Sequence, residues 1–342
     1  MPPPADLVVA VAPGRVNLIG DHTDTTGGLV LPMAIDLATT VRGRPGGEQV
    51  VLTSDDEAEP AVVPLDVGDP ATIEPAWARY VAGVVAELRP TAGFTGTVST
   101  TLPLGAGLSS SAALEVAVAL ALGFDGPTLD LAQLAQRAEQ RASGVPCGIM
   151  DQLASAAGVD GAALLIDCHD LAVAPVALPD DVEVRVVHSG EARRLAGSAY
   201  AERRSAVEAA EEELGPLRLL SDPAEVDRLT DPVLRRRARH VVTENGRVRD
   251  FATALAAGDV ALAGELMAAS HASLRDDFEV STPALDRLVE QLSGLPGVHG
   301  ARLTGAGFGG CAVALTRPGA LDEGWAVRPA AGAAVVGADR AG

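Results

Sequence analysis

The sequence predicts an α+β fold of two lobes. Short apolar runs typical of strands dominate the first third of the 342 residues, and helical spacing of apolar residues dominates the later part. Prolines and a pair of adjacent aspartates interrupt the pattern at residues 170–180. We therefore expect two domains, residues 1–175 and 176–342.

Composition narrows the class of protein. The 46 acidic residues against 26 basic residues give a formal net charge of −20, which repels nucleic acid and anionic lipid, so we expect neither as a partner. No apolar run approaches the length of a membrane span, and the first residues do not resemble a signal peptide. Three widely spaced cysteines fit a reducing compartment. We expect a cytoplasmic monomer.

The chain contains no lysine, so all 26 basic residues are arginine. A Walker A phosphate loop, the phosphate-binding strand of protein kinases and a pyridoxal Schiff base each require a lysine. If this chain binds nucleotide phosphates, it must use backbone amides, hydroxyls, a metal ion and arginine.

In the first half, strands are predicted at residues 7–11, 29–33, 38–42, 50–53, 94–102 and 162–167. Residues 55–75 are acidic and contain prolines, which predicts a loop or an irregular sheet edge. Apolar residues at helical spacing predict a helix at residues 77–88, and a second helix is predicted at residues 129–142. A proline–glycine break follows at residues 144–148, and a new element starts at residue 149.

In the second half, the pattern changes to helices. A strand is predicted at residues 182–188 and another at residues 312–315. Between them we expect helices at residues 200–214, 222–229, 233–243, 247–257, 261–274 and 283–292.

Residues 103–114 combine two glycines and three serines with an apolar, alanine-rich helix start. Glycine lets the backbone approach an anion, and a helix N-terminus directs unpaired N–H groups and a positive dipole end toward it. This stretch is either a phosphate cradle or a serine-capped helix after a flexible turn.

Three other groups of residues can carry chemistry. Asp21, His22 and Asp24 can bind a metal or sugar hydroxyls, or they can form a solvated turn. The nearby Arg15 can stabilise a phosphoryl group, or it can pair with Asp21 or Asp24. Glu139 and Asp151 can hold Mg²⁺ and deprotonate a hydroxyl, or be surface acids. The glycine cluster at residues 305–310 precedes a strand, which is the wrong order for a dinucleotide fingerprint.

Together these motifs resemble the GHMP small-molecule kinase superfamily and, within it, the galactokinase family. The three superfamily motifs correspond, in order, to residues 13–19, 103–113 and 303–311, and the family's sugar signature corresponds to residues 14–24. The resemblance runs from about residue 12 to residue 315. It implies a two-lobed fold with an N-terminal ribosomal-protein-S5-like domain, a C-terminal ferredoxin-like α+β domain and an active site in the cleft.

The resemblance also implies roles for individual residues in a reaction between ATP and galactose. Asp151 would be the base that faces the anomeric hydroxyl, and Arg15 would stabilise the transferring γ-phosphoryl group. Sugar hydroxyls would be held by Asp21, His22, Thr23 and Asp24, with Tyr200 closing the pocket. The ATP phosphates would be wrapped by Gly105, Ala106, Gly107, Leu108, Ser109, Ser110 and Ser111, with Ser111 and Glu139 on Mg²⁺ and with Ser54 and Trp77 near the adenine.

The chain departs from the family's pattern in the sugar signature. Asp21 stands where the family usually carries Glu, a carboxylate that faces the sugar's primary hydroxyl, and Thr25 and Thr26 replace the usual Tyr-Asn. We expect galactose as the substrate. The alternatives are an anomeric kinase for another sugar, such as an amino sugar or a pentose, and a non-catalytic sensor of galactose and ATP.

Overall fold

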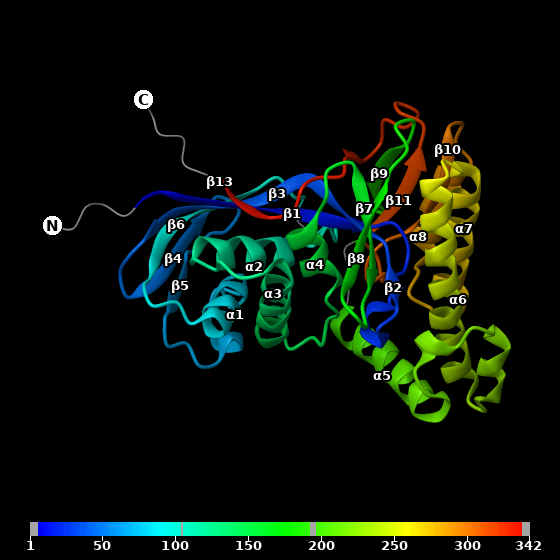
Figure 1. The fold of residues 1–342 in the computed structure, drawn as a ribbon, viewed down its shortest axis with the longest axis horizontal. Helices are drawn as coiled ribbons and strands as arrows, with labels where there is room; N and C mark the ends of the chain where they lie inside the picture. Colours follow the sequence, from blue (N-terminus) through cyan, green and yellow to red (C-terminus); the bar gives the residue numbers. More distant parts are fainter. Residues whose placement is uncertain (1–5, 104, 192–195, 337–342) are drawn as a thin grey trace.

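The computed structural model describes residues 6–103, 105–191 and 196–336. Helices and strands are mixed, and the strands of these residues form three sheets (Figure 1). The α+β class expected from the sequence is therefore confirmed. None of the helices in this part of the chain is long and apolar enough to cross a membrane.

The largest sheet has the strand order β13-β1-β3-β6-β4-β5. Strand β4 runs parallel to β6, while β1, β3, β5 and β13 pair antiparallel to their neighbours. Helices α1 to α4 lie together on one side of this sheet, where α2 and α4 pack on β1 and β3 and α3 packs on the other three helices (Figure 1). The strands are β1 (Val8–Asn17), β3 (Pro32–Pro45), β4 (Gln49–Ser54), β5 (Ala61–Pro64), β6 (Phe94–Thr100) and β13 (Ala334–Val336), and the helices are α1 (Ala78–Leu88), α2 (Ser110–Ala121), α3 (Thr128–Ser143) and α4 (Met150–Ala157).

The second half of the chain builds a four-stranded sheet of order β10-β11-β9-β12, against which α7 and α8 pack (Figure 1). A three-stranded sheet of order β2-β7-β8 lies between the two larger sheets (Figure 1). The remaining elements are β2 (Leu29–Val30), β7 (Ala162–Asp167), β8 (Ala172–Ala177), β9 (Glu183–His188), α5 (Ala196–Leu214), α6 (Pro232–Ala256), α7 (Val260–Asp276), α8 (Pro283–Ser293), β10 (Val298–Leu303), β11 (Cys311–Thr316) and β12 (Trp325–Val327), with short 3-10 helices η1 (Asp24–Thr26), η2 (Pro70–Thr72), η3 (Leu217–Leu219) and η4 (Pro223–Arg228).

Two helix predictions need correction. The helices expected at residues 233–243 and 247–257 are one continuous helix, α6, in which Gly246 lies midway. Val241 and Val248, seven residues apart, are both fully buried on the same face, so packing outweighs the local cost of the glycine. The helix expected at residues 222–229 is the 3-10 helix η4.

The interval expected to hold the domain boundary contains an unpredicted strand, β8. Pro175 lies inside it, and this is tolerated because β8 is the edge strand of its sheet. At the other end of the chain, β13 pairs with β1 in the first sheet. The division at residue 175 remains a prediction.

Helix α7 lies very close to β10 through a pair of glycines. A Cβ on Gly264 would lie 1.9 Å from the His299 carbonyl oxygen, and a Cβ on Gly300 would lie 2.5 Å from the Gly264 Cα. The helix can therefore approach the strand only while both positions carry no side chain. This contact fixes where β10, and the glycine-rich turn that follows it, stand relative to α6 and α7.

We predict that Gly264→Ala destabilises the protein by about 1–3 kcal/mol, because the new methyl overlaps backbone atoms that cannot move freely. The measurement is the urea unfolding midpoint. The matched control is Gly246→Ala in α6, where an added Cβ would meet no described atom within 4 Å. There the better helix propensity of alanine should stabilise by up to about 1 kcal/mol. Equal midpoints for the two variants would contradict the close-approach argument.

Candidate active site

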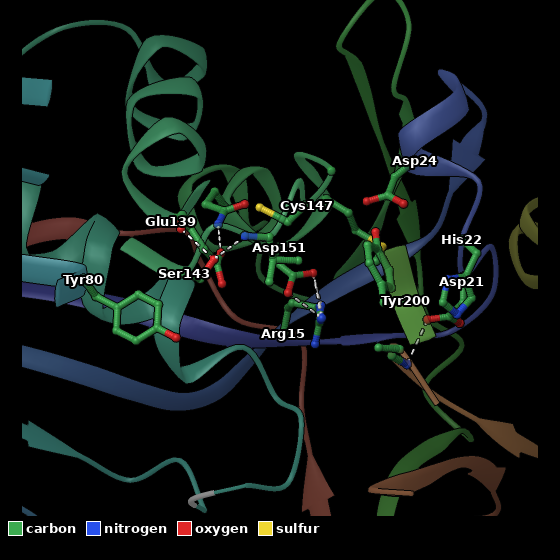
Figure 2. Close-up of a pocket in the computed structure, with 16 residues that line it drawn as sticks. Arg15, Asp21, His22, Asp24, Tyr80, Glu139, Ser143, Cys147, Asp151 and Tyr200 are labelled. Atoms are coloured by element: carbon green, nitrogen blue, oxygen red, sulfur yellow. Dashed lines mark hydrogen bonds and ion pairs between the residues drawn. The ribbon is translucent and has the colours of Figure 1, made fainter. Parts of the chain in front are cut away.

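A pocket of about 370 Å³ lies where the first sheet and its helices meet the loop after β1 and segments from the second half of the chain (Figure 2). One wall comes from β1, α3, α4 and the turn between these two helices, and the other comes from the loop after β1, α5 and the glycine-rich turn after β10. The two walls together contain most of the polar residues that the sequence analysis identified as candidates. Its residues are Arg15, Asp21, His22, Asp24, Tyr80, Glu139, Ser143, Val145, Cys147, Gly148, Met150, Asp151, Gln152, Tyr200, Gly305 and Ala306.

Arg15 and Asp151 form a two-pronged ion pair in this pocket (Figure 2). Arg15 lies on β1 just past a register shift, and Asp151 lies in the first turn of α4. The Arg15 Nε donates to Asp151 Oδ1 at 2.7 Å, and its Nη2 donates to Oδ2 at 2.6 Å. The alternative that Arg15 pairs with Asp21 or Asp24 is therefore wrong. This fork geometry fixes the direction of both carboxylate oxygens.

The glycine-serine loop is held against the same ion pair. The Arg15 Nη1 donates to the Gly107 carbonyl at 2.8 Å, and the Ser109 hydroxyl donates to Asp151 Oδ2 at 2.5 Å. Gly105 and Gly107 have φ angles of 74° and 75°, which only glycine adopts readily. Ser109 thus contacts Asp151 instead of capping α2, against the serine-cap alternative. Leu104, beside this loop, lies outside the described residues.

Glu139 meets Ser111 at the other side of the pocket, where the Ser111 hydroxyl donates to Glu139 Oε1 at 3.0 Å. Burial, and then the nearby Asp151 charge, raise the pKa of Glu139 to about 7. Behind it, the Gln152 amide contacts both Glu139 and Glu115, the latter at 3.2 Å. Burial raises the pKa of Glu115 well above its usual value.

Sequence reasoning missed Glu115 and Gln152, both of which are fully buried. Glu115 could have been identified, because it is the single acidic residue in the alanine-rich, apolar helix α2, and burying an unpaired charge there would destabilise the fold. Gln152 could not be identified in this way, because it follows the polar Asp151 and does not stand alone in an apolar stretch.

The loop after β1 brings Asp21, His22 and Asp24 to the pocket (Figure 2). Asp21 Oδ1 accepts from the Gly305 amide at 2.8 Å. The His22 ring packs against Phe278 at 4.6 Å and Tyr200 at 5.7 Å between ring centres. Burial, helped by His240 and Arg302, lowers the pKa of His22 to about 3, so its imidazole is neutral near pH 7.

Asp24 and Thr23 have different surroundings. Burial, and then the charges of Asp151 and Asp21, raise the pKa of Asp24 to about 7. Asp24 also packs so closely on Gly148 that a Cβ there would lie 1.9 Å from its Oδ2. The Thr23 hydroxyl donates to the carbonyls of Gly20 at 2.9 Å and Leu29 at 2.7 Å. Thr23 therefore braces the loop and does not line the pocket.

The remaining predicted residues lie at the edges of this site. Tyr200, on α5, lines the pocket, and burial raises the pKa of its hydroxyl well above the usual value. Ser54 and Trp77 line a second hollow of about 310 Å³, together with Ser110 and Ser111. Tyr80 borders both hollows, so they adjoin. The predicted site residues therefore line one of the two adjoining cavities or belong to the glycine-serine loop. Thr23 is the exception, because its hydroxyl points into the loop that carries it.

Three family models match the chain: the galactokinase galactose-binding signature at residues 2–45, the GHMP kinases N terminal domain at residues 79–159 and the GHMP kinases C terminal domain at residues 251–333. The galactokinase of Roseiflexus sp. (strain RS-1) is 47% identical over 337 residues, which cover 92% of this chain and 85% of that protein. The galactokinase of Homo sapiens is 45% identical and covers 89% of this chain and 82% of that protein.

Solved structures agree. Galactokinase of Lactococcus lactis, solved in complex with galactose, superposes with a TM-score of 0.90 at 32% identity and covers 97% of this chain and 95% of that one. A mevalonate kinase superposes with a TM-score of 0.66 at 20% identity over 91% of this chain and 92% of its own, which shows a common fold. This chain belongs to the galactokinase family of the GHMP kinases.

Proposed function

We propose that the chain transfers the γ-phosphoryl group of ATP to the anomeric hydroxyl of D-galactose, giving α-D-galactose 1-phosphate and ADP, with Asp151 as the base. One observation carries this proposal. Asp151 stands between the glycine-serine loop and the loop of Asp21 to Asp24, with contacts to Arg15 and Ser109 that fix its direction. Phosphoryl transfer depends mainly on positioning and charge stabilisation, which is what such a junction supplies.

In the reaction, the anomeric oxygen attacks the γ-phosphorus and its proton passes to Asp151. A bond forms between the sugar oxygen and phosphorus, the bond from phosphorus to the bridging oxygen of ATP breaks, and ADP leaves. Arg15 orients Asp151 through Nε and Nη2, and its guanidinium also supplies positive charge close to the transferring group. The backbone of residues 105–111 wraps the phosphates, and no lysine is required for this.

Ser111 and Glu139 are the residues that would hold Mg²⁺. Their facing oxygens, 3.0 Å apart, suit this ion because Mg²⁺ in kinases takes one or two protein oxygens and completes its shell with phosphates and water. Among the described residues no group of three or more acidic, histidine or cysteine side chains forms a dedicated metal cage, which agrees with this shared mode of binding. Bound Mg²⁺ would neutralise charge on the phosphate oxygens.

Galactose would bind against Asp21, His22, Asp24 and Tyr200. Carboxylates accept from the sugar hydroxyls, and the neutral His22 ring can both donate and accept. The hollow lined by Ser54 and Trp77 is of a size to receive the adenine. The relative from Lactococcus lactis, solved with galactose, supports the choice of sugar.

We further propose that the enzyme acts as a monomer in the cytoplasm, without nucleic-acid or membrane partners. The net charge of −20 supports the absence of anionic partners. The three cysteines, Cys147, Cys168 and Cys311, are few and widely spaced in the sequence, which suits a reducing compartment.

The substrate is tested by measuring ADP release with a panel of free sugars in the presence of ATP and Mg²⁺. We predict the highest kcat/KM for D-galactose, with galactosamine, glucose and pentoses lower. A higher kcat/KM for an amino sugar or a pentose would transfer the assignment to that sugar. Binding of galactose and ATP by calorimetry without any ADP release would favour a sensor.

We predict that Asp151→Asn lowers kcat by about 10²–10⁴-fold, the usual contribution of general base catalysis, while calorimetry still detects galactose binding. The matched control is Asp130→Asn, which changes an exposed aspartate in the first turn of α3, as Asp151 lies in the first turn of α4. The control should keep wild-type turnover. Near-normal turnover in Asp151→Asn would refute its assignment as the base.

The pH dependence follows from Asp24. Its pKa is raised to about 7, so Asp24 loses its charge as the pH falls through that value and becomes a poorer acceptor for sugar hydroxyls. With Mg²⁺ and ATP saturating, the KM for galactose should rise between pH 8 and pH 6. Asp24→Asn should show a high KM that changes little over this range. A steep pH dependence that persists in Asp24→Asn would assign it to another group.

A further inference from the structure

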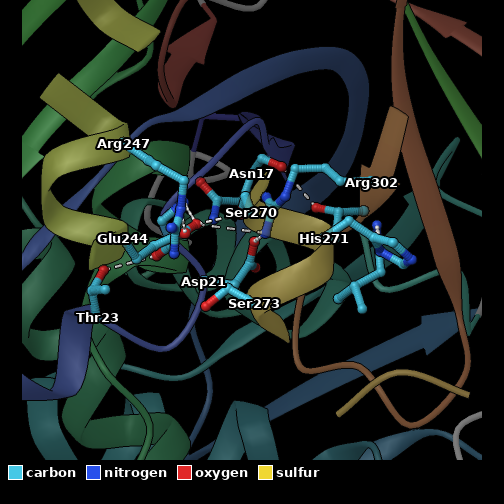
Figure 3. A network of polar contacts seen from close by, with 12 residues as sticks. Asn17, Asp21, Thr23, Glu244, Arg247, Ser270, His271, Ser273 and Arg302 are labelled. Carbon is cyan, nitrogen blue, oxygen red and sulfur yellow. Dashed lines mark hydrogen bonds and ion pairs between the residues drawn. The ribbon is translucent and has the colours of Figure 1, made fainter. Parts of the chain in front are cut away.

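A fully buried arginine, Arg302 of β10, lies directly behind the loop of Asp21 to Asp24 (Figure 3). Its Nη2 lies 2.6 Å from Asp21 Oδ2, and its Nη1 donates to the Leu18 carbonyl at 3.1 Å. Asp21 is only 1% exposed, yet it borders the pocket. Its two carboxylate oxygens thus face two partners from the same strand-and-turn segment: Arg302 itself and the Gly305 amide.

A second acid completes the group of charges. Glu244 of α6 is fully buried, forms an ion pair with Arg247 at 2.7 Å and lies 4.0 Å from the Arg302 Nη2 (Figure 3). It also accepts from the Gly20 amide at 3.1 Å, one residue before Asp21. Burial opposes the charged form of Glu244, but Arg247, His240 and Arg302 outweigh it and lower its pKa to about 2. We call Asp21, Glu244, Arg247 and Arg302 the buried charge cluster.

The buried charge cluster has balanced charge, with two carboxylates and two guanidinium groups. Its two cations are not equivalent, because Arg302 contacts Asp21 whereas Arg247 contacts Glu244 and the Thr243 hydroxyl. Removing either takes the nearest ion-pair partner from a buried carboxylate and costs stability. Only the removal of Arg302 frees the carboxylate that borders the sugar pocket, since Asp21 then keeps a single contact from Gly305.

We propose that Arg302 is a positioning residue for the sugar: it holds the Asp21 carboxylate in the pocket wall, so that Asp21 accepts from the bound sugar in one fixed direction. This inference rests on the proposed binding of galactose at the loop of Asp21 to Asp24. Arg302 does not touch the substrate, and its effect passes through Asp21. The C-terminal sheet, through β10, thereby sets the geometry of a recognition residue that belongs to the N-terminal part of the chain.

The first test compares Arg302→Met and Arg302→Lys with the control Arg247→Met. Arg302→Met should raise the galactose KM, and the Kd from calorimetry, by about tenfold or more, the scale of one hydrogen bond to a charged group. The KM for ATP and kcat should stay within about threefold. Arg302→Lys, which keeps the charge, should recover part of the affinity. Arg247→Met should lower the thermal midpoint comparably yet leave the galactose KM within about threefold.

The second test is a double-mutant cycle with Asp21→Asn. If Arg302 acts through Asp21, the loss of galactose affinity in the double variant should be close to that of Asp21→Asn alone, instead of the product of the two losses. Multiplicative losses would mean that Arg302 acts independently of Asp21 and would overturn the proposal.

Other outcomes are equally decisive. Unchanged galactose affinity in Arg302→Met, with a lowered thermal midpoint, would make Arg302 purely structural and overturn the inference while leaving the proposed function intact. If Arg302→Met does not fold, the comparison of Arg302→Lys with Arg247→Lys replaces it, with the same expected contrast in galactose KM. A wild-type chain that neither binds nor phosphorylates galactose would refute the proposed function itself, and the inference with it.

Discussion

The contact between Arg15 and Asp151 is the interaction on which the site depends. The guanidinium joins three parts of the chain that are distant in sequence: the strand β1 that carries it, the helix α4 through Asp151, and the glycine-serine loop through the Gly107 carbonyl. Arg15 is only 5% exposed, so these contacts are made in a setting where water competes weakly. A planar fork with fixed donors can hold all three directions at once, which a lysine ammonium cannot.

The opposite wall of the pocket is organised by a different principle. There the loop after β1 is braced by backbone-directed hydrogen bonds from Thr23 and by the buried charge cluster beneath Asp21. Buried charges are an expensive way to stabilise a fold, since each must be desolvated. They are effective at fixing orientation, because each group has few alternative partners. The pocket therefore joins a wall fixed by the contacts of Arg15 to a wall in which Arg302 holds the Asp21 carboxylate.

Much of this architecture follows from local sequence signals. Apolar spacing gave α1, α3, α7 and α8 nearly to their ends, and glycines, serines and clustered acids marked the loops that meet in the pocket. The failures have physical causes. The predicted helices leave a gap at residues 244–246, which α6 spans because buried residues on one face pack before and after Gly246. Pro175 predicts an interruption, although an edge strand accepts it.

The buried polar partners could not be predicted from the sequence in the same way. Arg302, Glu244 and Gln152 are separated from their contacts by tens to hundreds of residues, and no local pattern distinguishes them from surface polar residues. Their roles emerge only when the tertiary fold brings β10, α6 and α4 to the loops. The spacing of residues in the sequence can indicate which side chains face a ligand. The side chains that hold those residues in place can be identified only in the folded structure.

The pairing of β13 with β1 has a consequence for how the protein is made. Val9 pairs with Val336, so the outer edge of the strand that carries Arg15 stays open on the ribosome until almost the whole described chain has been synthesised. An open edge is a template for unwanted strand addition by other nascent chains. The first sheet thus gains its β13 edge only after every other described strand has been made, and until then the outer edge of β1 has no covering strand.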